Sequence, residues 1–391
     1  MHADSTLDID LAAIRRNAGR FRRGCGQRRA ICGVVKADAY GLGAAAIGPV
    51  LESAGWDMLA VHRIDEALSL LDHVHVPLLV LGPVRGLSPL HPLATPLSEG
   101  RIQLCVQDAD ALNDARSLGE SLGRPIPVHL EVDTGMGRGV PLEAVPAMLR
   151  GLLADQRLEP AGVMTHFTAA SDIACARNQY EQFDHSMLTM RRRLPVACHR
   201  HAAATTATLL DSSLRGDMVR IGLGWVGHAI GVDRPAIDGE SLEGAVRWTS
   251  RIASIRSVPQ GTPLGYGSRH TCLRDTRIAM LPVGYADGLP VQATGHSLSI
   301  LDTAGACLCT AQVVGTVAMD QVLLDVTHMP AGAVSIGTTV QVFDGTSLGA
   351  FASAMGLQPH HLLTAIGPRV HRRIADQTLA RGPQALSAAA G

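Results

Sequence analysis

The sequence predicts an α/β fold in which an N-terminal (β/α)8 TIM-type barrel precedes a C-terminal, mostly antiparallel β domain. Its first two-thirds alternates short apolar segments with amphipathic segments of helical length, which is the pattern of a parallel barrel. Near Gly239 this pattern gives way to short β segments separated by turn residues. The 391 residues exceed one ordinary domain and leave room for a barrel of about 250 residues. We therefore expect two domains, at residues 1–240 and 241–391.

Eight segments are expected to form the barrel strands, because each is short, apolar and bounded by turn or helix signals. They are Ala30–Val35, Asp57–Val61, Pro77–Leu81, Ile102–Val106, Pro127–Val132, Gly162–Thr165, Cys198–His201 and Asp217–Ile221. Helices are expected between most of them, at Ala44–Ser53, Ile64–Leu71, Asp108–Leu122, Leu142–Ala154 and Asn178–Arg193. The third unit lacks a clear helical segment.

The last third of the chain reads as a β domain. Its expected strands are Trp248–Val258, Arg277–Leu281, Ala311–Val317, Gln321–Val326 and Thr339–Phe343. Turn residues such as Asp344-Gly345 separate them, and a short helical segment is expected at Ser347–Met355.

Composition excludes several classes of protein. A net charge of −1 and a pI near 7.0 give no overall basic field for nucleic acid. No apolar run approaches the roughly 18 residues that span a bilayer, and the acidic start MHADSTLDID is not typical of a secretory signal. The eight cysteines sit mostly singly in apolar segments, as reduced thiols do. We expect a cytoplasmic protein without membrane, nucleic-acid or metal partners.

In a β/α barrel the chemistry sits at the carboxyl ends of the strands. Five of the eight expected strands end in ionisable residues, namely Lys36, Asp133, His166, His201 and Arg220. A salt-bridged rim explains one or two such residues. The joint pattern indicates a shared active site.

Lys36 and Arg220 suggest which cofactor this site binds. A lysine at a desolvated strand end can act as a Schiff-base nucleophile, although a rim lysine paired with Asp38 is the plainer alternative. Arg220 precedes Ile-Gly-Leu-Gly224, a turn whose N–H groups can cradle a phosphate or simply make a tight connection. Together they suggest pyridoxal 5'-phosphate in a barrel.

Tyrosine is rare in this chain, and its placement is informative. Three of the four tyrosines have glycine neighbours: Tyr40, Tyr266 and Tyr285. A tyrosine that packs in a core does not need glycine beside it, whereas one that approaches a ligand closely often does. These tyrosines are therefore candidate ligand-binding residues.

Eight motifs in one order now identify a resemblance that covers essentially the whole chain. They are VVKADAYGLGA (34–44), EVDTGMGRGV (131–140), THFTAASD (165–172), HAAATTATLL (201–210), VRIGLG (219–224), LGYGSRHT (264–271), VGYADG (283–288) and VGTVAMDQVLLDVT (314–327). The chain resembles the alanine racemases, the fold-type III pyridoxal-phosphate enzymes. The resemblance implies the same barrel and β domain.

The resemblance also implies how the barrel holds the cofactor. Lys36 would bind it covalently, Arg220 would face its pyridine nitrogen and His166 would lie near its ring. Its phosphate would be held by Tyr40, Thr205 and the backbone of Gly222 and Leu223.

The implied reaction is a two-base racemisation of alanine, as in the supply of a peptidoglycan precursor. Lys36 and Tyr266 would act from opposite faces. Arg138 would bind the substrate carboxylate, supported by Glu131 where the family often has a carbamylated lysine. Near the substrate the resemblance places Met319, Asp320 and Tyr285. In the family the second tyrosine and the Met-Asp pair come from the partner subunit, which implies a homodimer with composite sites.

Several departures from the family lie around the substrate entrance. Aromatic residues of the family are replaced by Val226, His360 and Pro368, and its arginine after Gly-Tyr-Ala-Asp-Gly by Leu289-Pro-Val291. A racemase of broader or different specificity, acting on serine or other amino acids, is therefore an alternative. Less favoured alternatives are a pyridoxal-phosphate decarboxylase, whose typical cysteine-aspartate motif is missing, and a non-catalytic carrier, which generally lacks the second domain.

Overall fold

The computed structural model describes residues 5–330 and 332–376. It divides the chain into two compact units. One contains residues 14–242, and the other combines the described residues up to Ala13 with the described residues from Glu243 onward. Across the described residues no helix has the length and apolar character needed to cross a bilayer.

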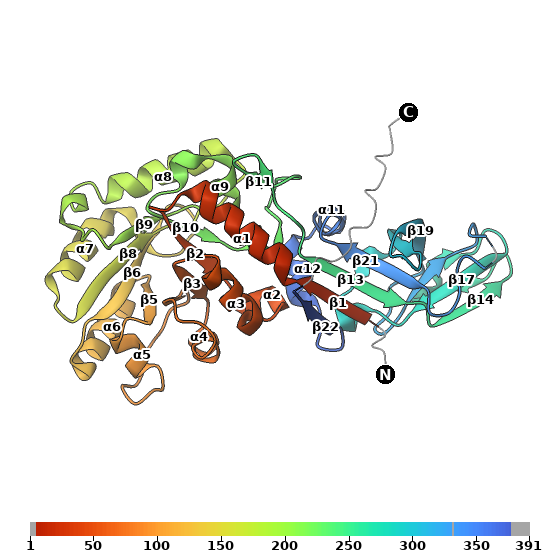
Figure 1. Ribbon diagram of the computed structural model, residues 1–391, viewed down its shortest axis with the longest axis horizontal. Helices are drawn as coiled ribbons and strands as arrows, with labels where there is room; N and C mark the ends of the chain where they lie inside the picture. The colour runs from red at the N-terminus through yellow and green to blue at the C-terminus, as the bar shows by residue number, and fades with distance from the viewer. Residues whose placement is uncertain (1–4, 331, 377–391) are drawn as a thin grey trace. The chain divides into compact units, whose positions relative to one another are not determined.

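Residues 14–242 form a nearly closed parallel barrel, which confirms the predicted fold (Figure 1). The strands follow one another around the barrel in the order β10-β2-β3-β4-β5-β6-β8-β9. They are β2 (Ala30–Val34), β3 (Met58–Val61), β4 (Leu78–Val80), β5 (Ile102–Val106), β6 (Ile126–Asp133), β8 (Leu158–Met164), β9 (His199–His201) and β10 (Met218–Ile221). A hydrogen bond from the Arg220 N–H to the Ala203 carbonyl (3.0 Å) joins the last strand to the chain just beyond β9. All eight predicted strands are present.

The helices of this unit agree less closely with the prediction. They are α1 (Leu11–Cys25), α2 (Lys36–Gly41), α3 (Ala44–Ser53), α4 (Ile64–Leu70), α5 (Ala94–Ser98), α6 (Ala109–Leu122), α7 (Val145–Ala154), α8 (Ile173–Ser186), α9 (Thr205–Leu210) and α10 (Leu223–Val226). The prediction was wrong at α8, which begins five residues before Asn178. The Asp172 side chain accepts a hydrogen bond from the Cys175 N–H (3.0 Å) and so caps the helix there.

The second unit is built on one sheet of nine strands in the described residues, in the order β14-β17-β20-β19-β18-β21-β13-β1-β22. The strands are β1 (Ser5–Asp10), β13 (Val246–Arg251), β14 (Ser254–Val258), β17 (Thr276–Leu281), β18 (Ser297–Leu301), β19 (Cys307–Val314), β20 (Val322–Asp325), β21 (Thr339–Asp344) and β22 (His371–Ala375). All of these strands pair antiparallel except β1 with β22. The helices α11 (Leu348–Ala354) and α12 (Pro359–Ala365) follow β21.

The single strand predicted at Trp248–Val258 is wrong, because the chain changes partner within it. β13 pairs with β21, whereas β14 pairs with β17 at the other end of the sheet. The change occurs at Ile252 and Ala253, whose N–H groups donate to Thr338 (3.0 Å) and Met280 (2.9 Å).

A glycine on β8 makes room for a polar side chain inside the barrel. Gly162 pairs with His129 of β6, at a point where the register of the two strands shifts. A Cβ atom at position 162 would lie 2.2 Å from the His129 Nδ1 atom. The buried His129 ring therefore fills the space that a side chain on β8 would otherwise occupy.

We expect Gly162→Ala to lower the free energy of unfolding by about 2 kcal/mol, because the new methyl group displaces a ring that is packed in the barrel. Chemical denaturation measures this change. Gly151→Ala is the control: a Cβ atom there has no neighbour within 4 Å, and alanine stabilises a helix interior by up to about 1 kcal/mol. Equal stability of the two variants would contradict the steric argument.

Candidate active site

Lys36 begins α2, with one residue between it and the end of β2, and part of its surface is accessible to solvent. The next four residues, Ala37 to Tyr40, have φ angles of 52–60° and form a left-handed turn. Such a conformation costs roughly 1–2 kcal/mol per non-glycine residue. Glu66 and Asp38 hold the turn: the Ala37 N–H donates to Glu66 Oε1 (2.6 Å), and the Ala44 N–H donates to Asp38 Oδ1 (2.7 Å).

The surroundings of Lys36 favour its neutral form. Desolvation lowers the pKa of Lys36 most, and the positive charges of Arg138 and Arg220 lower it further, while Glu66 opposes them. A lysine with a lowered pKa is a better nucleophile and a better base near neutral pH.

Hydroxyl and amide groups gather at the end of β10. Tyr40 is buried and stacks on Trp225, with ring centroids 5.6 Å apart. The Thr205 hydroxyl accepts hydrogen bonds from the N–H groups of Gly222 (3.1 Å) and Gly224 (3.2 Å). A Cβ atom on Gly222 would lie 2.3 Å from the Tyr40 hydroxyl. Glycine is thus required where the tyrosine meets the turn.

This cradle unites residues that are far apart in sequence. The structure brings together Tyr40, Thr205 and Gly222, with Leu223 next in the chain. Sequence reasoning missed Trp225, whose Nε1–H donates to the Val34 carbonyl (3.0 Å) and anchors α10 to β2. A tryptophan directly after a glycine-rich turn was the available signal.

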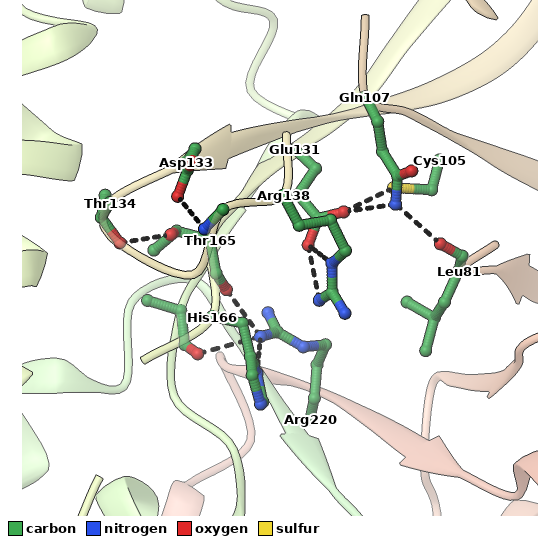
Figure 2. Close-up of polar contacts among 12 residues, drawn as sticks. Leu81, Cys105, Gln107, Glu131, Asp133, Thr134, Arg138, Thr165, His166 and Arg220 are labelled. Atoms are coloured by element: carbon green, nitrogen blue, oxygen red, sulfur yellow. Dashed lines mark hydrogen bonds and ion pairs between the residues drawn. The ribbon is translucent and has the colours of Figure 1, made fainter. Parts of the chain in front are cut away.

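Arg220 lies inside the barrel end, and its side chain is held by neutral acceptors (Figure 2). Nη2 donates to the carbonyl oxygens of Thr165 (2.7 Å) and Ala202 (3.0 Å) and lies 3.2 Å from His166 Nδ1; Nη1 donates to the carbonyl oxygen and Nδ1 of His201, both at 2.9 Å. Desolvation lowers the pKa of Arg220. The guanidinium is therefore ordered without a carboxylate among these partners.

Arg138 has the opposite environment. Its Nε donates to Glu131 Oε1 (2.9 Å), and its Nη2 lies 2.7 Å from the same oxygen (Figure 2). Glu131 is 1% exposed, and its other oxygen accepts a hydrogen bond from Gln107 Nε2 (2.7 Å). Sequence reasoning missed Gln107, because the residue carries no charge and follows a buried strand. An ordinary glutamate thus supports Arg138.

The loop that carries Arg138 is fixed by its own turn. Asp133 Oδ1 accepts hydrogen bonds from the N–H groups of Gly135 (2.8 Å) and Gly137 (3.1 Å). Asp133 and Glu131 therefore have different tasks: the first shapes the loop, and the second orients its arginine.

The remaining candidate residues lie in the second unit. Tyr266, Tyr285 and Met319 are 75%, 47% and 51% exposed. Their loops are neighbours: the Thr316 hydroxyl donates to the Tyr266 carbonyl (3.2 Å), and the Tyr285 N–H donates to the Ala318 carbonyl (3.0 Å). Asp320 is paired with Arg369 (2.6 Å). This unit therefore presents exposed phenol and thioether groups from one cluster of loops.

An amine, two arginines and a cradle of hydroxyl and amide groups at the carboxyl ends of parallel strands define a barrel enzyme for an anionic ligand. Comparisons with known proteins name the family. Residues 9–229 match the alanine racemase N-terminal domain, and residues 245–374 match the alanine racemase C-terminal domain. The chain belongs to the alanine racemase family.

Relatives and solved structures agree with this assignment. An alanine racemase of Geobacter sp. (strain M21) is 32% identical, over 95% of this chain and 98% of the relative. The crystal structure of alanine racemase from D-cycloserine-producing Streptomyces lavendulae matches with a TM-score of 0.86 and 25% identity, over 97% of this chain and 98% of that one. The Bartonella henselae alanine racemase, solved with covalently bound pyridoxal phosphate, shares the fold at 22% identity and a TM-score of 0.82, over 96% of this chain and 100% of that one.

Three histidines in the barrel make stability depend on pH. Burial, with the charges of Arg220, Arg138 and Lys36, lowers the pKa of His166 to about 3. Burial, with His199 and Arg220, lowers the pKa of His129 to about 3, and His201 is lowered in the same direction. The unfolded chain binds protons on these rings below pH 6.5, whereas the folded barrel does not until far lower pH. Stability therefore rises with pH between about 3 and 6.5.

We expect the free energy of unfolding to fall as the pH is lowered from 6.5 to 4.5, with roughly 2 kcal/mol of the fall due to His166. Denaturant titrations at several pH values measure the slope. His166→Asn should make the slope shallower, because His129 and His201 still contribute to it, whereas Asn in place of the exposed His185 should leave it unchanged. A His166→Asn protein with the parental slope would contradict the assignment of a neutral ring.

Proposed function

We propose that this protein is an alanine racemase that uses pyridoxal 5'-phosphate to interconvert L- and D-alanine. The observation that carries the proposal is the meeting, at one barrel end, of the Lys36 amine with the buried Arg220 and the cradle around Gly222. The family and the names of its relatives support it. We place the protein in the cytoplasm, with which its eight free cysteines agree.

The residues present suit this cofactor. Lys36 is the group for covalent attachment to its aldehyde, and Arg220 is the candidate partner of its ring nitrogen. Tyr40, Thr205 and the backbone at Gly222 and Leu223 would hold its phosphate, because Gly222 leaves space where a Cβ atom would meet the tyrosine hydroxyl. When bound, pyridoxal phosphate withdraws electrons and so stabilises negative charge at the amino-acid α-carbon.

The chain's own groups then bind the substrate and move one proton. Arg138, oriented by Glu131, binds the carboxylate of alanine. Lys36 Nζ accepts the α-proton from one face, and the Tyr266 hydroxyl gives a proton to the opposite face. For the other enantiomer the direction is reversed, so the phenol oxygen accepts and the amine donates.

We further propose that the site is completed by a second copy of the chain. Tyr266, Tyr285 and Met319 are exposed in their unit, and exposed aromatic and methionine side chains are typical of interface cores. A head-to-tail homodimer would bring this loop cluster, with Asp320, to the partner's barrel. The family resemblance supports this arrangement.

We expect Lys36→Ala to lose more than 10³-fold in racemisation rate in both directions, because one of the two bases is removed. Tyr266→Phe should lose at least 10²-fold and should wash solvent deuterium into the α-position of one enantiomer only, through the remaining Lys36. Chiral chromatography and mass spectrometry of alanine measure both effects. Parental rates in both variants would refute the proposal.

The same assay separates the alternatives. Carbon dioxide release with formation of ethylamine would indicate a decarboxylase, and a higher kcat/KM with serine than with alanine would indicate the broader racemase. Co-expression of the Lys36→Ala and Tyr266→Phe chains tests the dimer. If the tyrosine acts on the partner's site, each hybrid dimer contains one intact site and recovers activity that neither variant has alone.

Glu131→Gln should raise the KM for alanine roughly tenfold and change kcat less, because Arg138 loses its charged partner but remains positively charged. Steady-state kinetics measure this change. Glu159→Gln, at an exposed position, is the control. Added bicarbonate should leave the parent unchanged, since Glu131 needs no carbamylation; activation by bicarbonate would contradict this role.

A further inference from the structure

Four polar side chains form a continuous chain of hydrogen bonds inside the barrel. It begins at Arg220 of β10, whose Nη1 lies 2.9 Å from His201 Nδ1 on β9. His201 Nε2 lies 2.9 Å from His129 Nδ1 on β6. His129 Nε2 lies 2.6 Å from Gln103 Oε1 on β5. This hydrogen-bond chain thus joins side chains from four strands of the barrel.

β8 lies between β6 and β9 in the sheet, yet the two histidines meet across it. Gly162 of β8 makes this possible, because a Cβ atom there would lie 2.2 Å from His129 Nδ1. Both histidines are fully buried. The fold therefore keeps a space on β8 that serves this contact.

Arg220, the first residue of the hydrogen-bond chain, fixes the direction of every hydrogen bond in it. A guanidinium has donors only, so His201 Nδ1 must accept and carry no proton. A neutral His201 then has its proton on Nε2 and donates to His129 Nδ1. His129 in turn has its proton on Nε2 and donates to the Gln103 carbonyl oxygen. No other arrangement satisfies all three contacts with neutral rings.

Gln103, the last residue of the hydrogen-bond chain, determines whether the two imidazole rings stay neutral. Gln103 supplies a neutral acceptor, so no negative charge reaches Arg220 through the imidazoles. A carboxylate at this point would attract a second proton to His129. That proton would occupy His129 Nδ1, which would then be a donor facing the His201 Nε2–H donor. His201 would have to carry its proton on Nδ1 instead, where it would face the N–H donors of Arg220. The amide thus preserves both the orientation and the full positive charge of the guanidinium.

We propose that Gln103 and His129 are positioning residues of the active site, which act through His201 to orient Arg220 and to keep it unneutralised toward the cofactor ring. The inference rests on the proposed function for the identity of that cofactor. It deepens that function by assigning a role to two residues on the far side of the barrel interior. Neither residue touches the substrate groups described above.

The test uses the full chain loaded with pyridoxal phosphate and the near-isosteric variant Gln103→Met, which removes the acceptor and keeps the volume. We expect the dissociation constant of the cofactor to rise roughly tenfold and its visible absorption maximum to shift. The KM for alanine should change less than twofold, because the Arg138–Glu131 pair is untouched. Gln260→Met, in an exposed turn, is the matched control and should change neither quantity.

Gln103→Glu is the second variant, which keeps an acceptor and the side-chain length if the methionine variant does not fold. We expect it to bind the cofactor with an altered absorption maximum and to increase abortive transamination relative to racemisation. Imidazole ¹⁵N signals of the full chain should show two buried rings protonated on Nε2 in the parent and a changed pair in each variant. The inference would be overturned if Gln103→Glu had the parental absorption spectrum and the parental ratio of transamination to racemisation.

Unchanged cofactor affinity, absorption and imidazole signals in Gln103→Met would also overturn it, while leaving the proposed function intact. The proposed function fails instead if the parent neither binds pyridoxal phosphate nor racemises alanine. The imidazole signals still test the hydrogen-bond chain in that case, so the two failures are distinguishable.

Discussion

The barrel unit depends on one constraint: the guanidinium of Arg220 is buried and has no carboxylate among its hydrogen-bond partners. Removing a charge from water costs several kcal/mol even after relaxation. Arg220 offsets this cost through the carbonyl oxygens of Thr165, His201 and Ala202. Those carbonyls stand at the ends of β8 and β9, so the side chain of Arg220 on β10 links three strands at one end of the barrel. The nearby histidines must stay neutral, because a second cation there would be unpaired.

The two arginines of the site show how environment separates two similar groups. Glu131 is paired with Arg138, whose side chain stays half-exposed at the barrel end. Arg220 is buried, and the groups that accept its hydrogen bonds are neutral. Desolvation lowers the pKa of Lys36 most, and the positive charges of Arg138 and Arg220 lower it further. One barrel end therefore gives three residues of the same formal charge three different environments: a half-exposed arginine paired with a carboxylate, a buried arginine with neutral partners, and an amine with a lowered pKa.

The sequence predicts the strand ends well, because a buried strand that stops at a charged residue leaves a clear pattern. It identified Lys36 and Arg220 from this signal, and the eight barrel strands are all present. It did not reveal Gln103, a neutral residue on β5, or Gln107, a neutral residue directly after that strand, because β5 looks like ordinary core in the sequence. β1 was missed although Leu7 and Ile9 are fully buried with period two, because its partners β13 and β22 lie more than 230 residues away in the chain. Pairing between strands so far apart in the chain produces no recognisable pattern in the local sequence.

The sequence did not predict the left-handed turn after Lys36 either, because Ala37 to Tyr40 contain no glycine, the residue that usually marks positive φ angles. The turn stores several kcal/mol of strain by the usual cost per residue, and the fold opposes it with Glu66, Asp38 and the packing of Tyr40 on Trp225. A right-handed helix would place Lys36 and Tyr40 on the same face, one above the other. The left-handed path instead leaves Lys36 partly accessible at the barrel end and buries the Tyr40 phenol against Gly222. The strained turn therefore links Lys36 to the Tyr40 hydroxyl at Gly222 across a span of four residues.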